Sequence, residues 1–294
     1  MPPLVSVVIP TFNNASLIDE TLEGIKKQTF PDFEIIVVDD GSTDNTAGIV
    51  KYHDPAIIYA FQPNRGPAAA RNAGVKLAHG DYIAFCDHDD IWNSRHLEIL
   101  LGLFSTHPGL ALAFDNAEYF GDSRKAGQLH LGPQRSRALS NVPVSPRELL
   151  SDYPVASMSV VMVHRAAFDK LGGFNENIWG LDDLHFYLRL GAREAIRYTD
   201  YVGCRKRVAE NSLSQRINIK EANVRYLADL WRNDYKVARA IGPVSFKLRL
   251  ARKYFKLARF YRQNHNPHLA KQMFWNAYKM NPLNARYLWN AMIP

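Results

Sequence analysis

The feature that most constrains this chain is the alternation of short apolar runs with helical patterns over its first 115 residues. The apolar runs are rich in β-branched and aromatic residues, which is typical of buried strands. They cover residues 4–10, 33–40, 56–61, 81–87 and 110–115. The segments between them predict helices, the first capped by Ser16 and the others over about 44–52, 67–78 and 94–106. Because parallel strands need crossover connections, this order predicts an α/β fold, a mostly parallel sheet with helices on both faces.

Charge divides the chain into an acidic-leaning body and a basic tail. Residues 220–294 contain 15 Lys and Arg but only three acidic residues, a net of +12; since the whole chain carries +7, this leaves −5 for residues 1–219. The chain is 47% hydrophobic and 22% charged, which excludes a disordered protein. We therefore predict one α/β domain over 1–219, with halves at 1–115 and 116–219, followed by a basic helical region over 220–294.

The basic tail is predicted to form helices that break at Gly242, Asn266 and Asn281, each of which precedes a proline. Residues 257–282 resemble a tetratricopeptide-like helical pair. Residues 246–262 interleave cations with aromatic side chains. This pattern is typical either of a helix on an anionic membrane surface or of a solvated charged face with a core-facing stripe. We expect no nucleic-acid partner, because the body is acidic and no recognition motif accompanies the tail.

The cysteines and the apolar segments indicate the compartment. Cys86 and Cys204 belong to no metal-binding or redox motif, so we expect buried, reduced thiols. No stretch approaches the roughly 18 apolar residues of a membrane span, and no signal peptide is recognisable. We expect a cytoplasmic protein, either free or peripherally attached to the inner face of the cytoplasmic membrane.

Two of the predicted strands end in carboxylates, at the edge where α/β sheets bind their ligands. The second strand ends in Asp39 and Asp40, and the fourth ends in Asp-His-Asp-Asp over 87–90. A turn or a helix cap explains one such aspartate, but not three within four residues at a second strand end. An oxygen-rich cluster suits Mg²⁺ or Mn²⁺, completed by the phosphates of a ligand. Arg71, near the same edge, would either contact a diphosphate or base, or be a solvated helix residue.

Several segments, taken together, carry a resemblance to a known family. They are VSVVIPTFNN (5–14), QTFPDFEIIVVDDGSTDNT (28–46), NRGPAAARNAGVKLAHGDYIAFCDHDD (64–90) and LGGFNENIWGLDDLHFYLRL (171–190). Over roughly residues 4–215 the chain resembles the family 2 glycosyltransferases, in particular bacterial polysaccharide-type members. The resemblance implies the GT-A fold and inverting sugar transfer from a nucleotide-sugar donor.

On the donor side, the resemblance implies that Asp40 hydrogen-bonds the base, Asp87 faces the ribose and Asp89 binds the metal on the diphosphate. The metal would be Mn²⁺ or Mg²⁺, with Asp87 as a second candidate ligand, and Asp90 would be structural. His88 is expected to pack or hydrogen-bond more readily than to ligate a metal. The full donor set that we predict is Pro10, Thr11, Phe12, Asp39, Asp40, Arg71, Asp87, His88 and Asp89.

On the acceptor side, the resemblance implies that Asp183 is the catalytic base, with Asp182 as the alternative. Without this resemblance, Asp182 and Asp183 would be interpreted as carboxylates that interact favourably with a helix N-terminus. Trp179 would either stack on an acceptor sugar or be a core tryptophan. Residues 121–154 lack periodicity and are predicted to form an irregular acceptor-facing flap. Residues 205–207, a basic run, would either close over the diphosphate or form a charged surface. Ala209 stands where relatives often have histidine.

The expected activity is transfer of a sugar from a nucleotide-diphosphate donor, UDP-linked by preference, to a hydroxyl of a saccharide or lipid-linked glycan. Two other classes stay open. One is a catalytically degenerate protein that binds nucleotide sugar without turnover. The other is a sugar-phosphate nucleotidyltransferase, which would need a glycine-rich basic loop after the first strand; residues 10–14, PTFNN, provide neither feature.

Overall fold

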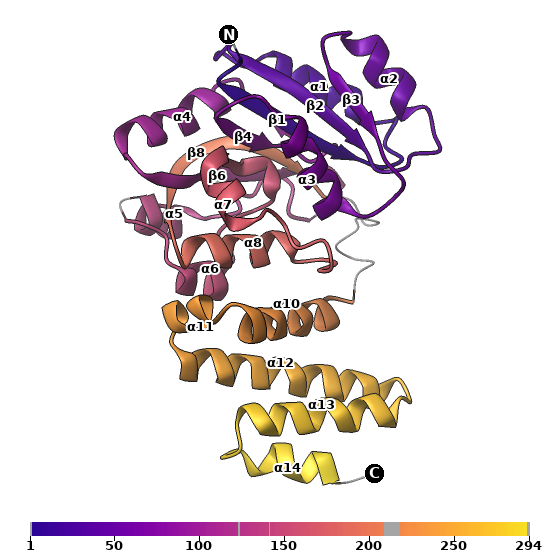
Figure 1. Ribbon diagram of the computed structural model, residues 1–294, viewed down its shortest axis with the longest axis vertical. Helices are drawn as coiled ribbons and strands as arrows, with labels where there is room; N and C mark the ends of the chain where they lie inside the picture. Colours follow the sequence, from indigo (N-terminus) through magenta and orange to yellow (C-terminus); the bar gives the residue numbers. More distant parts are fainter. Residues whose placement is uncertain (1, 123, 141, 209–217, 293–294) are drawn as a thin grey trace. The chain divides into compact units, whose positions relative to one another are not determined.

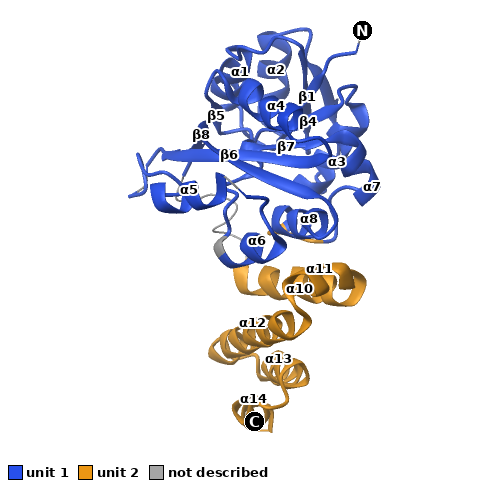
Figure 2. Cartoon of the chain, turned by 90° about the vertical axis from the view of Figure 1, so that its left-hand side faces the viewer, with its two compact units in different colours: residues 1–177, 182–212 blue, residues 178–181, 213–294 orange. Residues whose placement is uncertain are grey.

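The computed structural model describes residues 2–122, 124–140, 142–208 and 218–292. The chain forms two compact units, coloured in Figure 2: residues 1–177 with 182–212, and residues 178–181 with 213–294. Ala209, singled out above, lies outside the described residues.

The first unit is built on an eight-stranded sheet with the order β3-β2-β1-β4-β7-β6-β8-β5 (Figure 1). Strands β1 to β4 run parallel to one another, and so do β6 and β8. By contrast, β7 is antiparallel to β4 and β6, and β5 is antiparallel to β8. The strands are β1 Val5–Thr11, β2 Phe33–Asp39, β3 Ile58–Phe61, β4 Tyr82–Phe85, β5 Ile91–Trp92, β6 Leu110–Phe120, β7 Val161–His164 and β8 Ala195–Arg207.

The predicted α/β class, with its mostly parallel sheet, is confirmed. The predicted run at 110–115 becomes the longer β6, which does not lie beside β4. The later strand β7 pairs with both of them and separates them. The side chains of β1 are all buried, because helices cover both faces of the sheet at this position.

Helices pack on both faces of the sheet. Successive side chains of a strand point to opposite faces, so Tyr82 and Phe85 of β4 identify the two layers. The Tyr82 ring lies 4.7 Å from Phe104 of α4, and the Phe85 ring lies 6.2 Å from Phe168 of α7. The helices of this unit are α1 Ile18–Lys26, α2 Thr46–His53, α3 Pro67–Leu77, α4 His96–Thr106, α5 Pro133–Ser140, α6 Pro146–Asp152, α7 Arg165–Leu171 and α8 Asp182–Gly191, with a 3₁₀ turn η1 at Met158–Val160.

Two local predictions for this unit are wrong. Ser16 does not cap the first helix, which begins at Ile18; the Asn14 carbonyl accepts the Ile18 amide at 3.1 Å instead. The segment 121–154 is not irregular throughout, since it contains α5 and α6. Ser145 and Glu148 form a reciprocal capping box at the start of α6. These helices are too short to show a periodic apolar pattern.

The second unit is helical. Its helices are α10 Ile219–Asn233, α11 Tyr235–Ile241, α12 Pro243–Gln263, α13 Pro267–Met280 and α14 Ala285–Met292. The predicted breaks at Gly242, Asn266 and Asn281 are confirmed, and a further break falls at Asp234. Across the described residues, no helix combines the length and apolar character that crossing a bilayer requires.

The apolar side chains of α12 face the core of this unit. Phe246 and Leu250 are buried. The Phe255 ring packs 5.4 Å from Phe274 and 4.9 Å from Tyr287. The apolar stripe of 246–262 therefore faces the core, and the contact of its cations with a membrane surface stays a prediction.

Candidate active site

The carboxyl ends of β1 and β2 are joined at one edge of the sheet. Thr11 lies beside Asp39 in the parallel ladder, and the Asp40 amide donates to the Thr11 carbonyl at 2.8 Å. The loops beyond them are tied together as well, because the Asn13 amide donates to Ser42 Oγ at 2.8 Å. The edge is thus a rigid base for the side chains that follow.

Asp39 and Asp40 are both buried and hydrogen-bonded. Asp39 Oδ1 accepts from the Ser42 amide at 2.7 Å, and its Oδ2 accepts from Tyr59 Oη at 2.7 Å. Asp40 accepts from the amides of Arg65 and Gly66 at 2.9 and 2.8 Å, and from the side chain of Gln62 at 2.7 Å. Asp40 therefore holds the segment that leads into α3, and its contact with a base stays a prediction.

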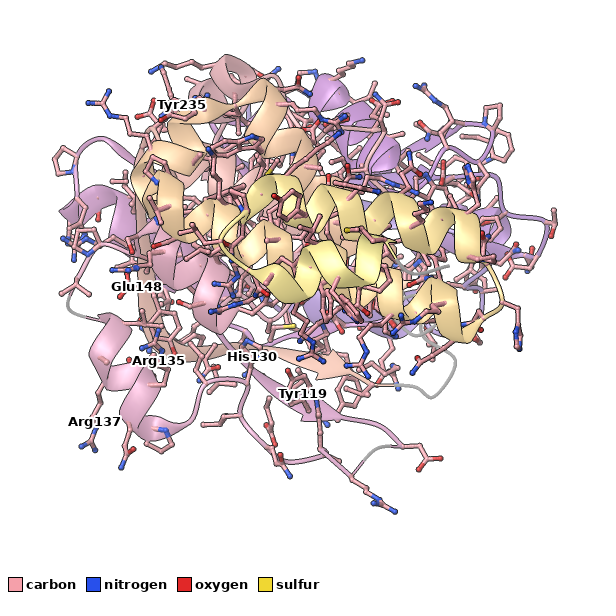
Figure 3. All side chains as sticks on the ribbon, turned by 90° about the horizontal axis from the view of Figure 1, so that it is seen from below. Tyr119, His130, Arg135, Arg137, Glu148 and Tyr235 are labelled. Atoms are coloured by element: carbon pink, nitrogen blue, oxygen red, sulfur yellow. The ribbon has the colours of Figure 1, made fainter. Side chains whose placement is uncertain are left out.

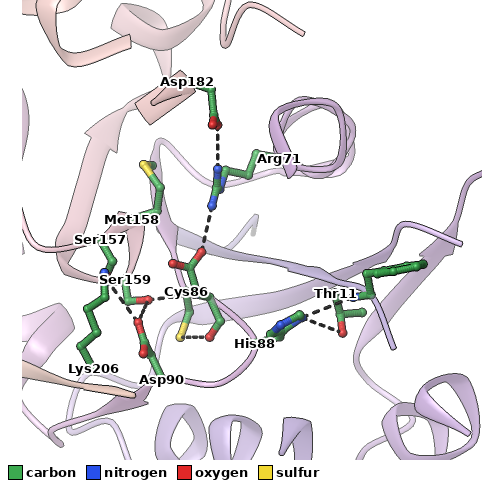
Figure 4. A network of polar contacts seen from close by, with 12 residues as sticks. Thr11, Arg71, Cys86, His88, Asp90, Ser157, Met158, Ser159, Asp182 and Lys206 are labelled. Carbon is green, nitrogen blue, oxygen red and sulfur yellow. Dashed lines mark hydrogen bonds and ion pairs between the residues drawn. The ribbon is translucent and has the colours of Figure 1, made fainter. Parts of the chain in front are cut away.

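His88 links the acidic loop after β4 to the end of β1. Its Nδ1 lies 3.3 Å from the Phe12 amide and 3.2 Å from Thr11 Oγ1 (Figure 4). Because the Phe12 amide can only donate, His88 Nδ1 is the acceptor. Pro10 is buried in β1, whereas the Phe12 ring is exposed and free to stack on a planar ligand.

Arg71 joins the donor-side and acceptor-side acidic groups. Its Nη2 lies 2.9 Å from Asp87 Oδ1 and its Nη1 lies 3.0 Å from Asp182 Oδ2 (Figure 4). The guanidinium is buried and also lies over the Phe174 ring, 5.8 Å from the centroid. A solvated helix arginine is excluded by this burial. The bridge brings together two acidic motifs from distant parts of the sequence.

The charges in this bridge support one another. Burial alone would lower the pKa of Arg71, but Asp87 and Asp182 outweigh it and the pKa is raised. Burial would likewise raise the pKa of Asp87, yet Arg71 and Lys206 lower it. At Asp182, burial prevails over Arg71 and raises the pKa to about 6. The site is held together by a desolvated ion-pair network rather than by surface pairs.

Asp183 is the more open of the two acceptor-side aspartates. Asp182 is buried against Arg71, whereas Asp183 is half-buried. Its Oδ1 accepts from the Leu184 amide at 2.6 Å and from Tyr153 Oη at 3.4 Å. Within the described part of the chain its Oδ2 has no hydrogen-bond partner. Burial raises the pKa of Asp183, which makes it a stronger base than an ordinary aspartate.

A histidine holds the backbone at Tyr153. His130 Nδ1 lies 2.6 Å from Tyr119 Oη, and its Nε2 lies 2.9 Å from the Tyr153 carbonyl. Tyr119 and His130 lie near each other in Figure 3. Tyr153 has a φ of 50°, a left-handed conformation that is rare for residues other than glycine. The sequence pattern did not single out these residues, since only the fold brings them to Asp183.

Asp89 and Asp90 have different environments. Asp90 is buried, and its carboxylate accepts from Ser159 Oγ at 2.6 Å and from the Arg207 amide at 2.8 Å. The carboxylate of Asp89 takes part in no hydrogen bond or ion pair with the described residues; only its carbonyl accepts, from Arg207 Nε at 3.0 Å. Asp90 therefore binds the loop to η1 and β8, and Asp89 keeps a carboxylate available.

The available carboxylate of Asp89 fits a divalent cation that also binds phosphate. Such a cation uses one or two protein carboxylates and completes its shell with water and phosphate oxygens. Asp87 lies two residues away, with its Oδ1 on Arg71. No group of three or more His, Cys, Asp or Glu side chains within the described ranges is arranged to hold a metal by itself. Asp89 and Asp87 therefore fit a cation that is also coordinated by the phosphate oxygens of a bound ligand.

The basic run at the end of β8 divides between the two faces of the strand. Arg205 and Arg207 lie over the Phe120 ring, at 4.6 and 4.4 Å from its centroid. Lys206 points the other way and donates to the Ala156 carbonyl at 2.5 Å. Burial raises the pKa of Asp89, and Lys206 is among the cations that oppose this rise. Lys206 therefore supplies positive charge to the acidic cluster.

Trp179 is not part of this network. It groups with the second unit and is 46% exposed, which excludes a buried core tryptophan. Its predicted role toward an acceptor sugar stays a prediction.

A sheet that presents acidic clusters and a buried arginine at the carboxyl ends of its strands defines an α/β protein with a polar ligand site at the usual edge. A family model described as Glycosyl transferase family 2 matches residues 6–172, more than half of the chain. The chain therefore belongs to glycosyl transferase family 2.

Curated relatives are similar to parts of this chain. Chondroitin synthase of Escherichia coli is 29% identical over 226 residues, covering 75% of this chain and 31% of that protein. Validoxylamine A glucosyltransferase of Streptomyces hygroscopicus is 31% identical over 219 residues, covering 65% of this chain and 52% of that protein. A UDP-Glc:alpha-D-GlcNAc-diphosphoundecaprenol beta-1,3-glucosyltransferase of Escherichia coli is 29% identical over 161 residues, covering 54% of this chain and 60% of that protein. The chain thus spans less than two thirds of the length of each.

Solved structures share the fold. S. aureus TarS, residues 1–349 in complex with UDP-GlcNAc, has a TM-score of 0.70 and 20% identity, covering 99% of this chain and 88% of that chain. The mannosyltransferase PcManGT from Pyrobaculum calidifontis, in complex with GDP-Man and Mn²⁺, has a TM-score of 0.62 and 20% identity, covering 100% and 81%. The fold is a mostly parallel α/β sheet with a C-terminal helical region and GT-A-like structural neighbours.

Proposed function

We propose that this protein is an inverting, metal-dependent glycosyltransferase that moves a sugar from a nucleotide-diphosphate donor to a hydroxyl of a saccharide or lipid-linked glycan. A UDP-linked donor is the preferred candidate, because TarS was solved with UDP-GlcNAc and one relative is named for UDP-Glc. A lipid-linked acceptor is supported by the diphosphoundecaprenol in that relative's name.

The observation that carries the proposal is the Arg71 bridge between Asp87 and Asp182. A nucleotide sugar has its diphosphate at one end and its reacting carbon next to it, so donor and acceptor groups must lie close together. The bridge holds the acidic motif after β4 against the start of α8 in this way. It also leaves Asp183, the neighbour of Asp182, with an open carboxylate oxygen.

In this mechanism Asp183 accepts the proton of the acceptor hydroxyl while that oxygen attacks the anomeric carbon. The attack comes from the face opposite the diphosphate, so the bond to the departing phosphate oxygen breaks as the new bond forms and the configuration inverts. Tyr153 orients Asp183 through its hydroxyl. Pro10, Thr11 and Phe12 would line the pocket of the base, with Asp40 hydrogen-bonding the base and Asp39 nearby.

Asp89, with Asp87, would hold Mn²⁺ or Mg²⁺ on the diphosphate. When bound, the cation neutralises the charge that develops on the leaving group. Lys206 adds positive charge to the same acidic cluster, which further favours departure of the diphosphate.

A thermal-shift screen tests the donor site. Uridine, guanosine and thymidine diphosphates and their sugars are compared with and without Mn²⁺. The proposal predicts stabilisation by one nucleotide class, dependent on metal and absent in Asp89→Ala. The matched control is Asp32→Ala, an exposed aspartate in the loop before β2 that should leave the shift unchanged. Absence of a shift with every nucleotide under every metal condition would contradict a functional donor site.

A further inference from the structure

Helices α13 and α14 and the loop between them leave large apolar side chains in solvent. Leu283 is 96% exposed, Trp289 68%, Met292 66% and Trp275 36%. These side chains lie outside the two buried clusters of this helical unit, one of which contains Ala270, Phe274 and Ala291 and the other Ala251, Ala277 and Tyr287. Large apolar side chains that stay exposed on neighbouring elements are typical of an interaction site.

Helical spacing places two of these side chains on the outer face of α14. Tyr287 and Ala291, at i and i+4, face the core. Trp289 and Met292 lie on the opposite side of the helix, three residues apart. Seen from below, α13 and α14 run next to each other within the helical unit (Figure 3), and their contacts are extensive. We call Trp275, Leu283, Trp289 and Met292 the apolar patch.

The segment that carries the apolar patch is basic. On α13, the exposed Lys271 and Lys279 precede and follow Trp275 at a spacing of four residues. Residues 243–294 contain no Asp or Glu at all. Their Lys and Arg residues are Lys247, Arg249, Arg252, Lys253, Lys256, Arg259, Arg262, Lys271, Lys279 and Arg286.

Part of this charge forms a stripe on α12. Arg252, Lys256 and Arg259 follow the spacing i, i+4, i+7, so they share one face of the helix. All three are exposed, and none forms an ion pair with the residues that the structure describes. A surface with free cations and no acidic residue is complementary to an anionic partner.

We propose that α12 to α14 bind the surface of an anionic lipid bilayer, with the apolar patch inserted at the interface and the cations on the lipid head groups. Tryptophan prefers the membrane interface, and lysine and arginine reach the head groups beside it. The binding is peripheral, in keeping with helices that lack the length and apolar character to span. The inserting side chains come from α13, α14 and the loop between them, because the buried apolar side chains of α12 face the core.

Other partners fit this surface less well. A second copy of the chain would need about 20–30 residues on each side of a stable interface, and the apolar patch has four. A nucleic acid would use the cations but would leave the exposed tryptophans, leucine and methionine in water. The proposal depends only on the helical unit, so it stands or falls independently of the proposed glycosyltransferase activity.

The test is sedimentation of the full chain with vesicles of phosphatidylcholine alone or of phosphatidylcholine and phosphatidylglycerol at 2:1. We expect binding to the anionic vesicles only, and release in 1 M NaCl. The variant Arg252→Gln/Lys256→Gln/Arg259→Gln should weaken binding about a hundredfold. The variant Leu283→Ser/Trp289→Ser/Met292→Ser should weaken it by about tenfold or more.

Matched controls come from the first unit. Tyr52→Ser removes an apolar side chain that is about as exposed as Leu283, and Lys76→Gln removes an exposed cation. Both variants should bind the anionic vesicles as the unchanged chain does. Quenching of tryptophan fluorescence by brominated lipid tests insertion without any substitution. Equal binding to neutral vesicles, no binding, no quenching, or binding unaffected by both triple variants overturns the proposal. So does self-association that the serine variant abolishes, since the patch would then bind a second copy.

Discussion

Replacing Arg71 by methionine tests the bridge that holds the site together. The change keeps much of the apolar stem but leaves Asp182 buried without its cation. Breaking a buried pair by removing one partner costs about 3–5 kcal/mol of folding free energy. Most of this should come from Asp182, since Asp87 is more exposed.

The loss should depend on pH in a defined direction. The folded-state pKa of Asp182 is about 6, above its ordinary value, so this group makes a stability contribution that falls as pH rises from about 4 to 6. Arg71 favours the ionised form, and its removal moves the pKa higher still. If the pKa of Asp182 in the variant rises above 7.5, Asp182 is protonated in the variant at pH 7.5 but ionised in the unchanged chain. The gap of about 1.5 pKa units then accounts for about 2 kcal/mol of the stability loss, at about 1.4 kcal/mol per pKa unit. At pH 5.5 Asp182 is mostly protonated in both proteins and this part disappears.

Chemical denaturation at pH 7.5 and pH 5.5 measures the effect. We expect Arg71→Met to lose about 3–5 kcal/mol at pH 7.5 and about 2 kcal/mol less than that at pH 5.5. The control is Arg65→Met, which removes an exposed cation paired with Glu176 and should cost no more than about 1 kcal/mol at either pH. An equal loss at both pH values, or a loss as small as that of the control, would refute the reasoning.

Three further predictions follow from single contacts. Asp183→Asn should keep the nucleotide-induced thermal shift but abolish sugar transfer, measured as product formation; near-full turnover would place the base elsewhere. Asp89→Ala should lose the metal dependence of nucleoside diphosphate binding in calorimetric titration, whereas unchanged affinity with Mn²⁺ would exclude it as a ligand. Gly203→Ala should lose more than about 3 kcal/mol in denaturation, because its Cβ would lie 1.7 Å from Asp115 Oδ2. The control is Gly102→Ala in α4, where the added Cβ would have no atom within 4 Å and the protein should gain up to about 1 kcal/mol of stability. Equal losses of stability in the two variants would refute the steric argument.

The first half of the sheet was predictable because each of its strands is a short apolar run between helical patterns. Residues 4–10 and 33–40 show this at β1 and β2, where neighbouring strands and helices bury every central position. The same reasoning could not place β7 between β4 and β6, since that pairing depends on contacts between distant parts of the chain. Nor could it find β5, which has only two residues.

The site was predictable in its members but not in its connections. Acidic residues at strand ends point to Asp39, Asp40, Asp87 and Asp89, because carboxylates are seldom placed at a buried edge without a partner. That Arg71 reaches both Asp87 and Asp182 follows from the packing of α3 against the segment before α8. Asn72 holds this packing by donating to the Phe174 carbonyl at 2.9 Å. Sequence alone offers no pattern for such a tertiary contact.

The measurement that tests the central claim most directly is the release of nucleoside diphosphate from nucleotide sugars, followed by a coupled assay with and without Mn²⁺. For a metal-dependent glycosyltransferase, we expect slow release in the absence of acceptor for one nucleotide class, dependent on metal and lost in both Asp89→Ala and Asp183→Asn. Release that needs no metal and persists in both variants, or no release from any nucleotide sugar under any condition, would contradict it.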